Sequence, residues 1–362
     1  MIGVVGGYGA VGRYAARLLA AQGSEPLRLG GRDPEAARRR LGAALPEAEW
    51  TAVDIEDAES LRTFIRGCRV VVNCAGPSHR TASRVARAAQ AAGVHYVDAG
   101  SDPTLAARAG EAIGTAAVFA AGALPGLSGL LPRWLACGFD AVSELTAYTG
   151  VLDRFTAAGA EDYLAGVLGE DNAALAAWRA GAPCPGALSR LSAVTLPFFP
   201  RPLTLLPYLD AEAKAVARHL SLVDGRWYIA LDGERLPAAL TAAAGLDRAA
   251  AVEHVCRASA LDAAGRRPYA SLLLQLSGRI DGTPATRTVR VQAAGIAPLT
   301  GAMAAAVTVA LLRGEVPAGV RPAAALPNPA PVIDVLSAAD GCDVAVFDSS
   351  IETLTDTVGG EV

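Results

Sequence analysis

The first 32 residues join a short apolar strand, a glycine-rich turn and a helix, and this unit constrains the fold more than any other part of the chain. The run from Ile2 to Val5 predicts a buried strand, and the alanine- and leucine-rich run after the turn predicts a helix. The turn between them consists of Gly6, Gly7, Tyr8, Gly9, Ala10, Val11 and Gly12. Glycines let the backbone approach a phosphate closely, and a helix N-terminus offers unpaired N–H groups. The unit therefore predicts a dinucleotide site.

The end of the second strand distinguishes between the two nicotinamide dinucleotides. An NAD-binding chain places Asp or Glu about 20 residues after the last glycine, where the carboxylate binds the ribose 2′-hydroxyl. Here the place is taken by Gly30, Gly31 and Arg32. A guanidinium suits a 2′-phosphate, so we expect Gly31 and Arg32 to bind NADP(H). Asp33 offers an NAD interpretation, but Asp33-Pro34-Glu35 is more typical of a helix start with an N-cap.

The first third of the chain alternates strand and helix patterns. Further strands are expected at 49–55, 69–74, 95–99 and 116–121, with helices at 34–45, 57–66, 78–92 and 103–113. This alternation predicts an α/β Rossmann fold with a doubly wound parallel sheet. We expect this NADP-binding domain to span residues 1–122.

After this domain the sequence pattern becomes typical of an α+β domain. Helices are expected at 126–136 and 156–181, strands at 142–151, 251–260, 269–280 and 285–293, and a proline-rich irregular arm at 182–208. Asp281-Gly282 predicts a hairpin turn between the last two strands. We expect an α+β substrate and dimerisation domain with a long-stranded sheet at 123–295. A C-terminal helix at 296–340 would return to the Rossmann domain, and an acidic tail with a mobile end would follow at 341–362.

Composition excludes several classes of partner. The net charge of −4 provides no basic field for nucleic acid. The four histidines show no metal-ligand spacing, and the six cysteines form no CxxC pair, which favours reduced thiols in the cytoplasm and no metal. We expect no signal peptide, because Met1 leads directly into the first strand. The uncharged stretch 291–312 contains Pro298 and is better explained by a buried helix than by a membrane span.

Four motifs within roughly the first 130 residues resemble the saccharopine dehydrogenase (reductase-type) family. They are the Gly6–Gly12 turn, Asn73-Cys74-Ala75-Gly76-Pro77, Gly93-Val94-His95-Tyr96-Val97-Asp98 and Gly122-Ala123-Leu124-Pro125-Gly126-Leu127-Ser128. The resemblance implies an NADP-binding oxidoreductase that acts at a C–N bond, by hydride transfer between the nicotinamide and an imine carbon. It also implies a homodimer. The proline-rich arm departs most from the lysine-pathway members, which puts saccharopine itself in doubt as the substrate.

Further cofactor contacts are expected at the ends of the third and fourth strands. Cys74, Ala75, Gly76 and Pro77 end the fourth strand at the carboxyl edge of the sheet, where open α/β folds bind ligands, and they suit the nicotinamide ribose. The resemblance places Asp54 near the adenine. A helix cap is the alternative for Asp54, and a proline turn without a ligand is the alternative for the loop.

Candidates for catalysis and substrate binding are spread over both domains. Hydride transfer needs a proton source, for which we consider His79, Asp153 and Tyr163. Arg154 can hold a carboxylate by two hydrogen bonds, and Ser128 begins a helix that can hold an anion. Asp98 and Tyr148 complete the candidate substrate contacts. Each also has a structural alternative, such as capping a helix or bonding to the neighbouring backbone.

These observations favour an NADPH-dependent reductase of an imine in a small, amino-acid-like molecule, for example a cyclic imine or thiazoline of a biosynthetic intermediate. One alternative is reduction of a carbonyl or C=C bond, although Lys214, the only lysine, follows no tyrosine at the spacing used by short-chain reductases. Another is a non-catalytic NADP(H)-binding regulator.

Overall fold

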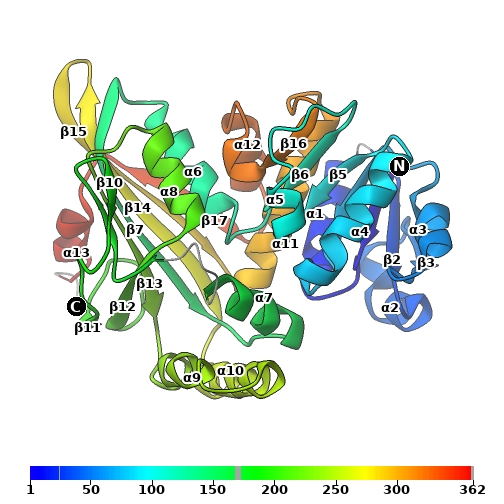
Figure 1. The fold of residues 1–362 in the computed structure, drawn as a ribbon, viewed down its shortest axis with the longest axis horizontal. Helices are drawn as coiled ribbons and strands as arrows, with labels where there is room; N and C mark the ends of the chain where they lie inside the picture. The colour runs from blue at the N-terminus through cyan, green and yellow to red at the C-terminus, as the bar shows by residue number, and fades with distance from the viewer. Residues whose placement is uncertain (24, 168–172, 360–362) are drawn as a thin grey trace. The chain divides into compact units, whose positions relative to one another are not determined.

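The computed structural model describes residues 1–23, 25–167 and 173–359 (Figure 1). The chain forms two compact units. Unit 1 comprises Met1–Leu130 and Ala297–Cys342, and unit 2 comprises Leu131–Ile296 and Asp343–Val362. Unit 1 is therefore discontinuous in sequence, because most of unit 2 is inserted into it.

Unit 1 is built on a seven-stranded parallel sheet, ordered β16-β6-β5-β4-β1-β2-β3. The strands are β1 (Ile2–Val5), β2 (Leu27–Gly31), β3 (Glu49–Ala52), β4 (Val70–Asn73), β5 (His95–Asp98), β6 (Ala116–Phe119) and β16 (Gly319–Pro322). β1 and β4 are buried throughout, as their apolar sequences predict. The strand order reverses between β1 and β4, which makes their carboxyl ends the topological switch point of a Rossmann fold. The predicted doubly wound parallel sheet is confirmed.

Most helices of unit 1 lie close to their predicted positions, but the C-terminal helix expected at 296–340 ends at Leu312, and β16 and a separate helix, α12 (Ala330–Ser337), follow it. The helices that connect or follow these strands are α1 (Gly12–Gln22), α2 (Pro34–Leu41) with η1 (Gly42–Ala44), α3 (Ala58–Ile65), α4 (Ser78–Ala91), α5 (Pro103–Ala106), α6 (Leu127–Ala136), α11 (Ile296–Leu312), η2 (Ala323–Ala325) and α12. The helix expected at 103–113 is wrong beyond its first turn. The chain leaves the helical path and the Gly110 N–H donates to the Val320 carbonyl at 2.8 Å, so this segment holds β16 instead.

Unit 2 contains a ten-stranded mixed sheet with the main order β10-β9-β13-β7-β14-β15-β17. Its long strands are β7 (Ala141–Leu152), β13 (Asp224–Leu231), β14 (Tyr269–Ile280) and β15 (Thr283–Ala293), and its helices include α8 (Ala211–His219) and α9 (Arg235–Ala243). The predicted hairpin between β14 and β15 is confirmed. Its two turn residues, Asp281 and Gly282, have φ of 51° and 72°, as this turn requires.

The strand expected at 251–260 is wrong, because this segment lies within helix α10 (Arg248–Asp262). The Asp247 side chain caps the helix by accepting from the Ala250 N–H at 2.9 Å. The buried residues Ala251, Val255 and Ala258 recur at helical spacing, and α10 packs beside α9 (Figure 1).

The segment from 156 to 208 also departs from expectation. Helix α7 (Ala157–Val167) covers only the first part of the expected helix, whose residues 168–172 lie outside the described residues. Short strands follow, namely β8 (Ala173–Ala174), β9 (Ala177–Arg179), β10 (Ala182–Cys184), β11 (Leu191–Val194) and β12 (Leu203–Leu209). The proline-rich arm is thus part of the sheet, because β12 alternates buried and half-buried residues and pairs with β13.

The segment expected as a mobile acidic tail instead forms strand β17 (Cys342–Phe347) and helix α13 (Ile351–Gly359). The Thr288 hydroxyl donates to the Ser349 carbonyl at 2.7 Å, and the Ile351 N–H donates to the Gln275 side chain at 2.8 Å. These bonds fasten the segment to β14 and β15. Among the described helices, none is long and apolar enough to cross a membrane.

Candidate NADP(H)-binding site

The glycine turn after β1 lies directly against the loop after β4. Gly6 has φ of +70°, and a Cβ there would lie 2.8 Å from the Ala75 backbone nitrogen. The turn is closed by the Gly9 N–H, which donates to the Gly6 carbonyl at 2.9 Å, and anchored by the Gly7 N–H, which donates to Gly30 of β2 at 3.0 Å. Only glycine satisfies both the backbone conformation and the close approach at position 6.

The start of α1 is arranged to receive an anion. Val11 is the N-cap residue and no side chain caps α1 among the described residues, although the Arg13, Tyr14 and Ala15 N–H groups donate to the Gly9 and Val11 carbonyls. The positive end of the helix dipole therefore faces the turn without a side-chain partner. A Cβ at Gly12 would collide with the Gly6 carbonyl oxygen, so the helix begins as close to the turn as the backbone allows. This arrangement fits the pyrophosphate of a dinucleotide.

The residues after β2 confirm one predicted helix start, those after β3 do not cap a helix through Asp54, and one contact was not revealed by the sequence. The Asp33 side chain accepts from the Ala36 N–H at 2.9 Å, so it is an N-cap as interpreted. Arg32 is exposed beside it. Asp54 accepts from the Glu56 N–H at 2.9 Å in a local turn.

The contact that the sequence did not reveal is made by Arg40 on α2. Its guanidinium donates to the Tyr8 carbonyl at 3.1 Å. In the sequence, the only sign of such a contact is the position of Arg40 on the basic face of α2.

The loop after β4 is held by side chains at both of its ends. The Asn73 side-chain oxygen accepts from the Ala75 N–H at 3.2 Å, and the Thr81 hydroxyl donates to the Ala75 carbonyl at 2.8 Å. Burial, with a further contribution from Asp98, raises the pKa of the Cys74 thiol far above its usual range. Cys74 therefore remains a neutral thiol and lines the loop without acting as a nucleophile.

Asp98 is buried at the end of β5 and is surrounded by hydrogen-bond donors. Its carboxylate accepts from the Asn73 amide at 3.0 Å and the Gly100 N–H at 2.7 Å, and it contacts the Tyr96 hydroxyl. Burial raises the pKa of Asp98 to about 6 although these bonds lower it. With 1 % of its surface exposed, Asp98 lies below the loop rather than at its surface.

His79 and Ser128 both begin helices at the same edge of the sheet. His79 is in the first turn of α4 and is half-buried next to Arg80. Ser128 lies in the first turn of α6, but its N–H donates to the Ala123 carbonyl at 3.2 Å and the Leu127 N–H donates to Gly122 at 2.9 Å. These two donors are therefore bonded within the loop, and the role of Ser128 in substrate binding stays a prediction.

The remaining candidates belong to unit 2. Both carboxylate oxygens of Asp153 accept backbone N–H groups, from Arg154 at 2.7 Å and from Ile296 at 3.0 Å, so Asp153 caps the start of α11. Arg154 is exposed. Tyr148 stacks on Tyr228 at 5.3 Å within an apolar cluster. Tyr163 contacts the ring of Phe155, and burial raises its pKa to about 12, which makes it a weak acid.

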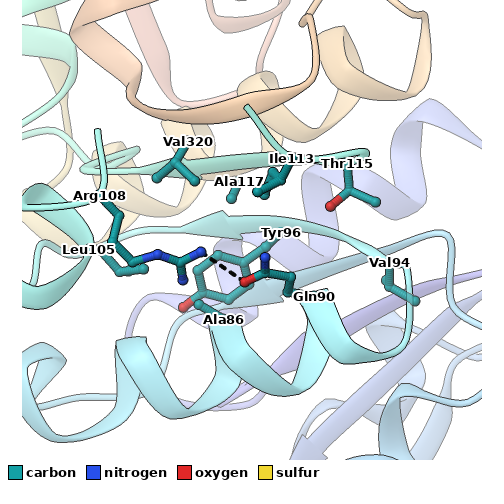
Figure 2. A pocket seen from close by; sticks show the side chains of 10 residues that line it. All are labelled: Ala86, Gln90, Val94, Tyr96, Leu105, Arg108, Ile113, Thr115, Ala117 and Val320. Carbon is teal, nitrogen blue, oxygen red and sulfur yellow. Dashed lines mark hydrogen bonds between the residues drawn. The ribbon is translucent and has the colours of Figure 1, made fainter. Parts of the chain in front are cut away.

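Unit 1 thus brings together at one edge of its sheet all the residues expected to bind the cofactor. A small hollow elsewhere in unit 1 is not part of this edge (Figure 2). Its side chains include Val94 and Thr115, which precede β5 and β6 and therefore lie at the amino edge, and Arg108 closes it with a hydrogen bond to Gln90 at 2.9 Å. Among the described residues, no cluster of His, Cys, Asp and Glu could hold a metal ion.

Comparison with known proteins assigns the cofactor. Residues 2–118 match the Saccharopine dehydrogenase NADP binding domain. Saccharopine dehydrogenase (L-Glu forming) from Saccharomyces cerevisiae has the same fold, with a TM-score of 0.66 over 96% of this chain and 99% of that chain at 13% identity. A search of curated proteins gave no match.

Two other solved structures share only a part of the chain. Triphenylmethane reductase from Citrobacter sp. has 23% identity and a TM-score of 0.24, covering 28% of this chain and 37% of its own. Pen from Bacillus thuringiensis has 16% identity and a TM-score of 0.25, covering 26% and 36%. Residues 2–118 therefore form an NADP(H)-binding domain similar to that of saccharopine dehydrogenases, and the chain as a whole has the fold of the yeast saccharopine dehydrogenase.

Proposed function

We propose that this chain is an NADPH-dependent reductase of a C=N bond in a small, amino-acid-like molecule, with cyclic imines and thiazolines of biosynthetic intermediates among the candidate substrates. The observation that carries the proposal is the contact between the Gly6 turn and the Ala75 loop at the switch point, in a chain with the fold of a saccharopine dehydrogenase. NADPH supplies a hydride when bound. The protein must then orient the imine, exclude water and provide a proton.

Among the three candidates for the proton donor, the contacts favour His79. Asp153 uses both carboxylate oxygens to cap α11, and the raised pKa of Tyr163 makes its proton harder to release. His79 lies two residues after Pro77, the residue that ends the candidate nicotinamide loop. An imidazole at this place can donate a proton to the amine nitrogen as the hydride arrives.

The substrate class can be tested by following NADPH oxidation with a panel of cyclic imines, open-chain imines, ketones and enones. Consumption of NADPH with imines alone supports the proposal. Turnover of ketones or enones without imines would establish the carbonyl or C=C alternative. Tight NADPH binding without turnover of any panel member would favour a regulator.

The proton donor can be tested with His79→Gln. We expect kcat to fall about 10²- to 10⁴-fold, as for loss of a general acid, while the Kd for NADPH is unchanged. Asp153→Asn is the comparison, because it is expected to lower stability through the cap of α11 rather than kcat. Full activity of His79→Gln would assign the proton to another group.

We further propose that residues 1–122 bind the cofactor, that residues 123–295 carry Tyr148, Arg154 and the other substrate contacts, and that the protein is a cytoplasmic homodimer. All six cysteines are free thiols, which supports a reducing compartment. Light scattering of the purified protein gives the oligomeric state directly.

A further inference from the structure

The space at the end of β2 where an NAD-binding chain holds its acid is filled by an aromatic ring. A Cβ at Gly31 would lie 2.5 Å from a ring carbon of Tyr8 and 2.6 Å from its hydroxyl oxygen. Tyr8 comes from the glycine turn, and its ring stacks on Trp50 of β3 at 6.1 Å with an interplanar angle of 28°. A side chain at position 31 therefore cannot enter without moving this ring.

A second contact, from the Arg40 guanidinium, holds the backbone of Tyr8 in place. The Arg40 guanidinium donates to the Tyr8 carbonyl at 3.1 Å, which places its charge over the glycine turn. Its side chain is exposed, as is that of Arg32. Neither guanidinium has a carboxylate within 4.0 Å in the part of the chain that the structure describes. Two cations without an ion-pair partner among the described residues thus lie on adjoining segments of the site.

The Tyr8 ring fills the space at the end of β2 and brings no charge of its own to this place. Its hydroxyl is buried close to the backbone of Asp33. Burial, with a further contribution from the Asp33 carboxylate, raises the pKa of Tyr8 to about 12, so the ring adds no negative charge beside an anion. The ring is therefore an uncharged group close to Arg32, while Arg40 contacts the backbone of Tyr8.

We propose that Tyr8, Gly31 and Arg40 determine the choice of NADP(H) over NAD(H): the Tyr8 ring excludes an acid from the end of β2, and Arg40 joins Arg32 in binding the 2′-phosphate. A phosphate with two guanidinium partners gains charge-assisted bonds that a 2′-hydroxyl cannot replace. This inference rests on the NADP(H) site alone and not on imine reduction. It can therefore be tested by binding, without a substrate.

The contribution of Arg40 is tested by titrating the purified full chain with NADPH, NADH, 2′,5′-ADP and 5′-AMP in a calorimeter. We expect Arg40→Ala to weaken NADPH and 2′,5′-ADP by about 10- to 100-fold, the usual loss for a bond to a charged group, and to change NADH and 5′-AMP little. Arg39→Ala is the matched control, because it removes the same charge from the neighbouring exposed position of α2. Circular dichroism confirms that each variant is folded.

Two results would overturn this assignment. If Arg40→Ala weakens NADPH and NADH equally, its bond to Tyr8 only fastens the turn. If it weakens NADPH no more than Arg39→Ala does, the effect is one of general charge.

The exclusion by Tyr8 is tested by the variants Gly31→Asp, Tyr8→Ala and the double variant. We expect Gly31→Asp alone to weaken both cofactors, because the new side chain meets the ring. The double variant should bind NADH more tightly than the wild type, because Tyr8→Ala clears the space for a carboxylate that can reach the 2′-hydroxyl. If Gly31→Asp alone binds NADH as tightly as the double variant, Tyr8 excludes nothing and the inference fails.

Discussion

At the scale of single residues, the carboxyl edge of the Rossmann sheet depends on a buried acid that does not reach the surface. Asp98 joins the ends of β4 and β5 through Asn73, and it contacts Tyr96, whose hydroxyl also lies 3.0 Å from the Ala82 carbonyl. One hydroxyl proton cannot serve both oxygens at the same time. Protonation of Asp98 relieves this conflict, in keeping with its raised pKa.

This arrangement predicts a pH dependence of stability. The pKa of Asp98 is raised from 3.8 to about 6 in the folded chain, so its contribution is fully present below its unfolded pKa and is lost as the pH rises through about 6. We expect the unfolding free energy of the wild type, relative to Asp98→Asn, to fall over this range by at most about 3 kcal/mol. Denaturant unfolding at several pH values measures it, and parallel curves for the two proteins would contradict it.

At the scale of elements, helix α11 supports the glycine turn from behind. A Cβ at Gly301 would lie 2.7 Å from the Val11 carbonyl oxygen and 2.9 Å from the Ala15 nitrogen, so α11 meets the start of α1 at this point. Most of α11 is buried, as expected from its uniformly apolar sequence. Helix α11 thus positions the start of α1, where we propose that the pyrophosphate binds.

Substituting Gly301 should therefore affect both stability and cofactor binding. We expect Gly301→Ala to lower the unfolding free energy by about 1–3 kcal/mol through overpacking, and to raise the Kd for NADPH by moving the start of α1. The control is Gly166→Ala in α7, where a Cβ has open space and should stabilise the helix by up to about 1 kcal/mol. Equal effects of the two substitutions would show that the contact at Gly301 is unimportant.

The elements of unit 1 were predictable because local signals agree with the tertiary structure. Asp33 caps α2, and the glycine turn lies where its spacing placed it. In unit 2 the local sequence signals disagree with the tertiary structure. The segment of α10 was predicted as a strand, but Asp247 caps a helix there and the buried Ala251 and Val255 lie one helical turn apart. The prolines near β12 suggest a loop. The segment nevertheless forms a strand, because alternate residues are buried and it pairs with β13.

The site was predictable to the same extent as the fold that carries it. Backbone-based contacts such as the Gly6 turn follow from sequence, because glycine spacing reports backbone geometry. The contact of Arg40 with Tyr8 and the burial of Asp98 do not, because each depends on how segments distant in sequence pack together.

At the scale of the whole molecule, the C-terminal segment completes unit 2 rather than trailing from it. Arg290 pairs with Asp343, Phe347 stacks on Phe198 at 5.2 Å, and Ile351 is buried in the apolar cluster that contains Phe199. A chain ending at Gly341 would lose all of these contacts.

For this truncation we expect the unfolding free energy of unit 2 to fall by about 3 kcal/mol or more, since burial of one isoleucine alone is worth about 1.5–3 kcal/mol. The Kd for NADPH should be unchanged, because the residues proposed to bind the cofactor belong to unit 1. Tryptophan fluorescence reports mainly on unit 2, which holds Trp134, Trp178 and Trp227. Loss of NADPH binding on truncation would show that the units depend on each other.

The discontinuity of unit 1 sets the order in which the nascent chain can fold. Strand β16 closes the sheet beside β6, but it is translated only after residues 131–296. At typical synthesis rates the ribosome needs on the order of tens of seconds for this stretch, during which β6 has an unpaired edge. The NADP(H) domain, although first in the sequence, must therefore finish folding late, and chaperones that bind exposed strand edges have their best opportunity in this interval.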